Sequence, residues 1–265
     1  MSESDFMVDR ITTLLGREVF WSVLSELPFA WNVGPLNELP IGQRDFLERG
    51  AFVLRTSTDR LSQIEIKYMF SELPREEQER AERFRRVADH DTFVYTHWLL
   101  RYTLGTILGL PGMALAIATG TFGKPCLAHS ERTVEFNISH SQGEIALIFS
   151  EKQSVGIDLE SLDRKTDWHD LAQRFFHPLE FSSLLTIEAC EQEKAFVRLW
   201  TLKESVIKAI GRGLSQSLDS FVVPSQMFIH GQRGIVTVGE ATVRVVPLPN
   251  DTVCAGAIAL VEPMA

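Results

Sequence analysis

An α+β fold is predicted by three features of the sequence, which is 265 residues long. Two long segments, 92–108 and 193–210, carry apolar residues at helical spacing. Short apolar or alternating runs, typical of strands, follow each of them. Residues 98–104 also resemble residues 200–206, with a tryptophan, a leucine, a basic residue, a hydroxyl residue and an aliphatic residue in register. Such a weak repeat is what a duplicated half-domain leaves behind, and chance also produces matches of this length.

The first part of the chain divides into a leader, a strand and two helices. Residues 1–45 are expected to form a loosely organised N-terminal leader of unknown role, and residues 51–55 a short strand. Residues 74–91 are dense in charge, which is typical of a solvated helix, and a second helix is predicted over 92–108. Proline and glycine interrupt the uncharged segment 102–123, so we expect a helix end, a turn and a strand there instead of a membrane span.

The second part alternates strands and helices. Residues 134–138 and 144–149 are expected to be paired strands, with a turn over the polar residues 139–143 between them. The other expected elements are strand 155–159, helices 171–176, 179–185 and 193–210, the last ended by Gly211, and strands 235–238, 242–246 and 253–261.

Composition excludes several classes of protein. Hydrophobic residues make up 45% and charged residues 23%, which excludes wholesale disorder. The net charge of −9 disfavours a protein that coats nucleic acid, although a local basic patch can still bind one anion. Cys126, Cys190 and Cys254 are far apart and in no metal-like spacing, which predicts a reducing compartment. The acidic N-terminus does not resemble a signal peptide, so we expect a cytoplasmic protein without membrane or nucleic-acid partners.

Two acidic residues share one face of an expected strand. Residues two apart in a strand point to the same side, so Asp158 and Glu160 aim together while Ile157 and Leu159 point into the core. Two adjacent carboxylates repel each other unless one is protonated or a cation bridges them. A hard divalent cation with oxygen ligands satisfies the pair. An exposed edge strand with two solvated acids is the other interpretation.

The second long helix carries a carboxylate and a cation that the first lacks. Glu204 and Lys208 are four residues apart, so they lie one above the other on a helix face. They form either an ordinary surface ion pair or a third metal-binding carboxylate beside a cation for the same anionic substrate. The corresponding residues of the first copy are Tyr102 and Thr106. If the copies share a fold, a single site lies where they meet, with its polar chemistry mainly from the second copy.

Two turn-like segments place polar groups beside expected strands. Ser139 and His140 suit a phosphate contact, the orientation of a nucleophile or a simple turn. Gly123, Lys124 and Pro125 bring a backbone amide and a cation together, and an ordinary turn has the same composition. The chain contains neither a Gly-x-x-x-x-Gly-Lys-Ser/Thr phosphate loop nor a Gly-x-Gly-x-x-Gly turn after a strand. Nucleotide binding of those two kinds is therefore disfavoured.

In this order, the motifs resemble those of one known family. They are Phe-Gly-Lys-Pro at 122–125, Phe-Asn-Ile-Ser-His-Ser at 136–141, Gly-Ile-Asp-Leu-Glu at 156–160 and Trp-Thr-Leu-Lys-Glu-Ser-Val-Ile-Lys at 200–208. Their order and spacing are similar to those of the 4′-phosphopantetheinyl transferases of the Sfp type. Each motif alone is unspecific, but the four together are specific. The resemblance runs from about residue 71 to the C-terminus and leaves residues 1–45 without a counterpart.

The resemblance implies a fold and an activity. The fold is a pseudo-dimer of two similar α+β halves, here 46–152 and 153–265, with the active site in the cleft between them. The activity is Mg²⁺-dependent transfer of phosphopantetheine from coenzyme A to a serine of an apo acyl carrier protein or peptidyl carrier domain. The other product is 3′,5′-adenosine bisphosphate. A monomer is expected, because one chain already supplies both sides of the cleft.

The resemblance also implies a role for each site residue. Asp158, Glu160 and Glu204 are the carboxylates around Mg²⁺, although Mn²⁺ accepts the same oxygen ligands. Lys208 steadies the phosphate at the reaction centre, and either Glu204 or a metal-bound water held by Glu160 removes the proton of the carrier serine. The implied coenzyme A-binding residues, besides Lys208, are Arg80 at the 3′-phosphate, Gly123, Lys124 and Pro125 beside the adenine, and Ser139 and His140 at a phosphate.

Two other functions stay open. A Mg²⁺-dependent phosphohydrolase acting on a nucleotide uses the same three carboxylates, and a non-catalytic module that binds coenzyme A or a carrier belongs to a different class. By family analogy the carrier docks on residues 174–185. There Phe175, Phe176, Phe181 and Leu184 are either exposed anchors or core, and at least half of them are expected to be core.

Overall fold

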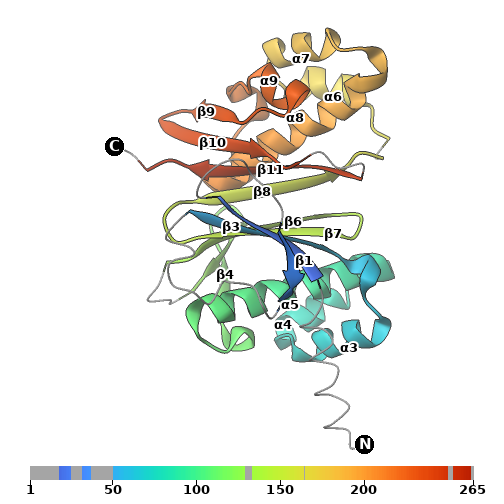
Figure 1. The fold of residues 1–265 in the computed structure, drawn as a ribbon, viewed down its shortest axis with the longest axis vertical. Helices are drawn as coiled ribbons and strands as arrows, with labels where there is room; N and C mark the ends of the chain where they lie inside the picture. The colour runs from blue at the N-terminus through green and yellow to red at the C-terminus, as the bar shows by residue number, and fades with distance from the viewer. Residues whose placement is uncertain are drawn as a thin grey trace, which may run out of the picture.

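Two antiparallel sheets lie face to face in the computed structural model, and helices cover the outer side of each (Figure 1). The structure describes residues 18–24, 32–36, 50–128, 133–163, 165–249 and 253–263. In Figure 1 the helices of the C-terminal part lie at the top and those of the N-terminal part at the bottom, with both sheets between them. This arrangement confirms the predicted α+β class.

The sheets divide the chain by sequence. Within the described residues, the first sheet contains, in spatial order, β2 (Asn32–Pro35), β1 (Glu18–Leu24), β3 (Ala51–Ser57), β7 (Glu144–Ser150) and β6 (Glu135–Ser141). The second contains β8 (Val155–Ser161), β11 (Cys254–Val261), β10 (Ala241–Pro247) and β9 (Gly234–Val238). A short ribbon pairs β4 (Ile117–Thr119) with β5 (Pro125–Leu127).

The helices fall into two groups, one for each sheet. The first group is α3 (Gln63–Glu72), α4 (Arg75–Ala81) and α5 (Val87–Leu108), and the second is α6 (Trp168–Phe175), α7 (Pro178–Leu185), α8 (Ala189–Ile210) and α9 (Ser225–His230). Short 3-10 turns occur at Thr58–Arg60, Gly112–Ala114, Gly213–Ser215 and Leu218–Ser220. No helix in the described ranges is long and apolar enough to cross a membrane.

The described parts of the expected leader are strands. Residues 18–24 and 32–35 form β1 and β2, and β1 pairs with β3, so these segments belong to the first sheet. The prediction of a loose leader over 1–45 is wrong for them. The sequence did not predict these strands, because prolines interrupt the segment. In addition, β3, with which β1 pairs, lies further along the chain. Leu36 is also described and is buried, and the remaining residues of this segment lie outside the described part.

Several element boundaries also differ from prediction, among them the starts of α6 and α8, which lie three and four residues earlier. The charged segment 74–91 is not one helix: α4 ends at Ala81, and α5 begins at Val87 instead of residue 92. Charge density marks no helix end, so the sequence pattern did not show this break. The expected turn 139–143 is shorter, because β6 continues to Ser141 and a two-residue turn follows. Ser139 and His140 are therefore strand residues.

The two sheets meet along a seam between their edge strands β6 and β8. Alternate side chains of β6 accept hydrogen bonds from alternate backbone N–H groups of β8. The bonds run from Ile157 N to Asn137 Oδ1 at 2.9 Å, from Leu159 N to Ser139 Oγ at 3.1 Å and from Ser161 N to Ser141 Oγ at 3.1 Å. These side chains satisfy N–H groups that would otherwise form an unpaired sheet edge. Behind the seam, apolar side chains of both sheets form a shared core.

A glycine lets α8 lie directly on β8. A Cβ atom at Gly156 would stand 2.1 Å from the carbonyl oxygen of Ser205 and 2.4 Å from the nitrogen of Ala209. No larger residue fits this contact without separating the helix from the strand. The close approach sets the carboxylates of β8 beside the polar residues of α8.

A buried ion pair holds the long helix of each half. In the first half, Arg101 Nε donates to Glu77 at 2.8 Å, and Arg101 Nη1 donates to the carbonyl of Leu115 at 2.8 Å. In the second, Lys203 Nζ lies 2.8 Å from Glu180, and both side chains are fully buried. Lys203 also donates to two carbonyls that follow its helix, those of Leu218 at 2.7 Å and Phe221 at 2.8 Å.

Candidate active site

Strand β8 and helix α8 bring the predicted acidic residues together. Asp158 is 4% exposed, and its Oδ1 lies 2.7 Å from Lys208 Nζ. Glu160 and Glu204 are half-buried. Burial raises the pKa of Glu204, and the negative charges of Asp158 and Glu160 raise it further, whereas Lys208 opposes the shift. The charges of Asp158 and Glu160 on β8 therefore both act on Glu204 of α8.

One carboxylate oxygen has no protein partner. Within the described residues, Asp158 Oδ2 is buried and accepts no hydrogen bond. An orphaned buried carboxylate oxygen is costly unless a cation or a ligand satisfies it. In the part of the chain that the structure describes, no group of three or more Asp, Glu, His or Cys side chains is already arranged to hold a metal ion. The chemistry of the three carboxylates nevertheless fits a hard cation. Three carboxylates supply more negative charge than the single positive charge of Lys208 can balance.

Lys208 uses all three of its N–H donors within the protein. Besides Asp158, its Nζ donates to Ser139 Oγ and to the carbonyl of Ile157, both at 3.2 Å. An ammonium has three donors, so an incoming phosphate must replace one of the two longer bonds. The lysine thus joins strand β6, strand β8 and helix α8 at one point.

His140 lies near the same charges but points outward. Its side chain is exposed at the surface. Partial burial lowers its pKa, and the positive charges of Lys208 and His97 lower it further, while Asp89 opposes them. The charges that act on His140 therefore come from both long helices, α5 and α8.

A cavity of about 280 Å³ collects most of the predicted binding residues. The turn 123–125 lines it together with Glu204 and Lys208, although these segments are far apart in sequence. Several of the lining residues were not predicted to belong to a site; one of them, Gly211, follows the end of α8 three residues after Lys208. The lining residues are Phe122, Gly123, Lys124, Pro125, Asn137, Ile138, Glu204, Ile207, Lys208, Gly211 and Gly213.

The ammonium of Lys124 is turned into the protein. It donates to Glu135 at 3.3 Å, to Ser154 Oγ at 3.1 Å and to the carbonyl of Val155 at 2.9 Å. Burial lowers its pKa, and Glu135 opposes that shift. The lysine therefore ties the turn that forms one wall of the cavity to the starts of β6 and β8.

Arg80 stands apart from these groups. Its side chain is exposed on α4, and its guanidinium carbon lies 5.2 Å from the centre of the Phe93 ring. Neither cavity reported in this subsection includes it in its described lining. Arg80 therefore lies beside α5, where the Phe93 ring also stacks on His97.

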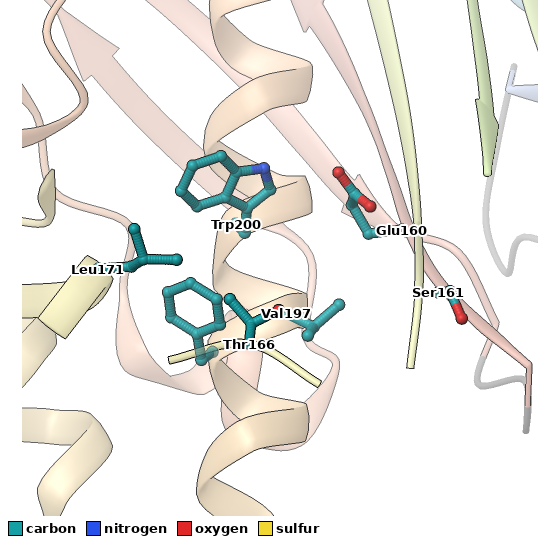
Figure 2. A pocket seen from close by; sticks show the side chains of 7 residues that line it. Glu160, Ser161, Thr166, Leu171, Val197 and Trp200 are labelled. Atoms are coloured by element: carbon teal, nitrogen blue, oxygen red, sulfur yellow. The ribbon is translucent and has the colours of Figure 1, made fainter. Parts of the chain in front are cut away.

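A second, smaller cavity of about 50 Å³ borders Glu160. Figure 2 shows Glu160 on its strand at one side and Leu171 at the other, with Trp200 and Val197 of α8 between them. The wall is otherwise mainly apolar, with Phe196 among its members. Helical spacing could have predicted that Trp200 lies near the site, because residue 200 is one turn before Glu204 on the same helix.

The apolar residues named in the predicted docking segment divide between core and surface. Phe176 and Leu184 are buried, and Phe181 packs against the same core. Phe175 is 36% exposed and carries the guanidinium of Arg174 over its ring. The expectation that at least half of these apolar residues pack inward is confirmed.

Comparisons with known proteins identify the family. The sequence model of the 4′-phosphopantetheinyl transferase superfamily matches residues 154–243, and that of the 4′-phosphopantetheinyl transferase N-terminal domain matches residues 60–153. The chain is 36% identical over 163 residues to the 4′-phosphopantetheinyl transferase Sfp of Bacillus subtilis, covering 62% of this chain and 71% of that protein. It is 36% identical over 156 residues to a putative 4′-phosphopantetheinyl transferase of Synechocystis, covering 58% of this chain and 63% of the relative. With HetI of Nostoc, another 4′-phosphopantetheinyl transferase, it shares 34% over 146 residues, or 54% and 62% of the two chains. The chain belongs to the 4′-phosphopantetheinyl transferase superfamily.

Proposed function

We propose that this chain transfers the 4′-phosphopantetheine group of coenzyme A to a serine of an apo acyl carrier protein or peptidyl carrier domain, and releases 3′,5′-adenosine bisphosphate. The observation that carries the proposal is the gathering of Asp158, Glu204 and Lys208 beside a cavity whose other wall is the turn 123–125. Acidic residues and a lysine beside such a cavity suit a phosphate anhydride better than an uncharged substrate.

The larger cavity suits the nucleotide end of coenzyme A. Phe122 is 53% exposed at the cavity and offers a flat surface to an adenine. Lys208 lies at the same cavity and meets the phosphates. The smaller cavity borders Glu160 and has a mainly apolar wall, which fits part of the uncharged pantetheine arm. The anhydride of coenzyme A would then lie between Glu160 and Glu204.

Asp158, Glu160 and Glu204 are the residues proposed to hold Mg²⁺, and Mn²⁺ accepts the same oxygen ligands. The orphaned Oδ2 of Asp158 and the raised pKa of Glu204 support this donor set. A bound divalent cation supplies Lewis-acid neutralisation of phosphate charge. His140, Ser139, Lys124 and Arg80 stay proposals as coenzyme A contacts.

Glu204 is proposed as the general base and Lys208 as the cation at the reaction centre. The carrier serine oxygen forms a bond to the β-phosphorus, while the bond from that phosphorus to the bridging oxygen breaks and leaves its electron pair on the oxygen. The serine proton passes to Glu204, whose carboxylate lines the larger cavity beside Lys208. Lys208 stabilises the charge that develops on the phosphate oxygens.

The proposal includes a cytoplasmic, monomeric enzyme. Residues of both halves line the larger cavity, so one chain supplies both of its sides. Its three cysteines, all within the described residues, are free thiols, which agrees with a reducing compartment.

Intact mass spectrometry tests the proposal. An apo carrier protein is incubated with the enzyme, coenzyme A and Mg²⁺, and the expected product is the carrier with one added phosphopantetheine. EDTA and Glu204→Ala each abolish the gain. Water-dependent cleavage of coenzyme A without a carrier would identify a phosphohydrolase, and coenzyme A binding without turnover across several carriers would identify a binding module.

A further inference from the structure

We infer that Gly213 is a positioning residue that holds Phe122 at the wall of the larger cavity and so sets the space for the nucleotide end of coenzyme A. The inference rests on the proposed function of that cavity. Both residues line the cavity, although they are far apart in sequence. Gly213 opens the short 3-10 turn that follows α8, and Phe122 belongs to the turn between β4 and β5.

Gly213 lies directly on the backbone of Phe122. A Cβ atom at position 213 would stand 2.9 Å from the carbonyl oxygen of Phe122 and 3.4 Å from its Cβ. Neither atom can turn aside as the end of a long side chain can, so relieving the contact requires a shift of the backbone. The lack of a side chain at position 213 therefore permits the two segments to meet.

The backbone conformation at Gly213 is a separate constraint. Its φ is +53°, in the left-handed region that favours glycine. Asparagine adopts this region more readily than alanine does, because its short polar side chain forms local hydrogen bonds. Alanine and asparagine both carry a Cβ atom, but they differ in backbone strain. The two substitutions thus separate the effect of the contact from the effect of the strain.

The turn that carries Phe122 is fixed from its other side. Its backbone is closed by a hydrogen bond from Gly120 N to the carbonyl of Lys124 at 2.8 Å and by one from Gly123 N to the carbonyl of Gly120 at 2.9 Å. The buried ammonium of Lys124 ties the turn to the starts of β6 and β8. A side chain at position 213 would therefore push against an anchored turn, and either Phe122 or the segment after α8 would have to move.

Gly231 supplies a matched control. It follows α9 with a φ of +66°, and a Cβ atom there would have no atom of the described residues within 4 Å. The described linings of the larger and the smaller cavity do not include it. Gly231→Ala therefore introduces similar backbone strain without the contact on Phe122.

The test compares Gly213→Ala and Gly213→Asn with Gly231→Ala. Calorimetry measures the affinity for adenosine 3′,5′-bisphosphate, and time courses of carrier modification give kcat and the KM for coenzyme A. We expect both variants at position 213 to lose affinity and to raise KM by about 10-fold, with kcat within about twofold of the wild type, because a Cβ atom packed against backbone displaces Phe122. Gly231→Ala should keep the affinity, KM and kcat of the wild type.

Several results would overturn the inference. Wild-type affinity in both variants at position 213 shows that Phe122 does not depend on Gly213. Recovery of affinity in Gly213→Asn, or an equal loss in Gly231→Ala, assigns the effect to backbone strain. A lower kcat with unchanged KM moves the effect to the reaction centre, and a wild type that does not bind the bisphosphate removes the basis of the inference.

Failure of the proposed function is a separate outcome. If the wild type binds the bisphosphate but transfers nothing, the proposed function fails, and the affinities still decide whether Gly213 positions Phe122. If Gly213→Ala does not fold, Gly213→Asn and Gly231→Ala decide the question, because asparagine keeps the Cβ atom at a lower cost in backbone strain.

Discussion

In the first half of the molecule, α5 runs for 22 residues and ends at Gly109 with φ +67°, and in the second α8 runs for 22 residues and ends at Gly211 with φ +73°. The left-handed conformation at both glycines ends each helix by the same device. Each helix also carries a buried cation, Arg101 or Lys203, at the same place in the sequence repeat. Two regions with little sequence in common thus share a scaffold, which supports duplication over chance.

The difference between the halves lies one position further along each helix. Tyr102 stacks on Trp98 with ring centroids 5.3 Å apart, and Thr106 donates to the carbonyl of Tyr102 at 2.9 Å. At the corresponding positions of α8 stand Glu204 and Lys208, which line the larger cavity. The buried cations of the two helices are equivalent in chemistry, but the carboxylate and the lysine at these two positions occur in α8 only. The placement of the long helix in each half therefore does not depend on the polar residues at these positions.

The ion pairs should differ in how much they stabilise their halves. Lys203→Met is expected to lower the free energy of unfolding by about 3–5 kcal/mol, because it leaves Glu180 as an uncompensated charge in a fully buried position. Arg101→Met should cost less, since Glu77 keeps 13% of its side chain exposed. Denaturant titration measures both. The double variant Lys203→Met with Glu180→Leu recovers most of the loss, and equal costs in the two halves would contradict the comparison.

Activity should respond only in the second half. Lys208→Met is expected to reduce carrier modification by about 10²–10³-fold, because it removes a preorganised cation from the charge that develops at the phosphate. Thr106→Val, at the corresponding position of α5, should change the rate by less than about twofold. Rates come from time courses of carrier mass. A comparable loss in Thr106→Val would show that both halves contribute to the chemistry.

The first half should carry an acid-sensitive contribution to stability. Burial opposes ionisation of Glu77, but hydrogen bonds from His97 and Arg101 outweigh it and lower its pKa from 4.5 to about 2. Ionised Glu77 therefore stabilises the fold above pH 4.5, and this stabilisation is lost as pH falls towards about 2. Thermal midpoints across this range should fall less steeply in Glu77→Gln. If the thermal midpoint of Glu77→Gln fell as steeply with pH as that of the wild type, Glu77 would not be the source of this contribution.

The smallest expected effect concerns the helix ends. Gly109→Ala and Gly211→Ala should each lower the free energy of unfolding by about 1–2 kcal/mol, because alanine is disfavoured at positive φ. Similar values from denaturant titration support a common device. A cost at one glycine only would indicate that the two helices end for different reasons.

Local patterns predicted the parts of the site that lie on a single element. Alternation along β8 placed Asp158 and Glu160 on one face, and the buried Ile157 and Leu159 confirm it. Helical spacing placed Lys208 on the same face as Glu204. That β8 and α8 lie side by side came from the family resemblance, because nothing local encodes a contact between residues 50 positions apart.

Contacts between distant segments were the ones that sequence did not predict. The seam of β6 with β8 uses side chains that look like turn residues, since their alternation has meaning only once the partner strand is known. The ammonium of Lys124 points inward because Glu135, Ser154 and Val155 converge on it from two strands.

We propose that only α8, and not α5, carries acidic and basic groups that take part in the transfer. The rate of phosphopantetheine transfer to an apo carrier, followed by intact mass in Glu204→Gln and in Tyr102→Phe, tests this proposal. We expect a loss of at least about 10²-fold for Glu204→Gln and a rate near that of the wild type for Tyr102→Phe. Full activity in Glu204→Gln, or an equal loss in Tyr102→Phe, would contradict it.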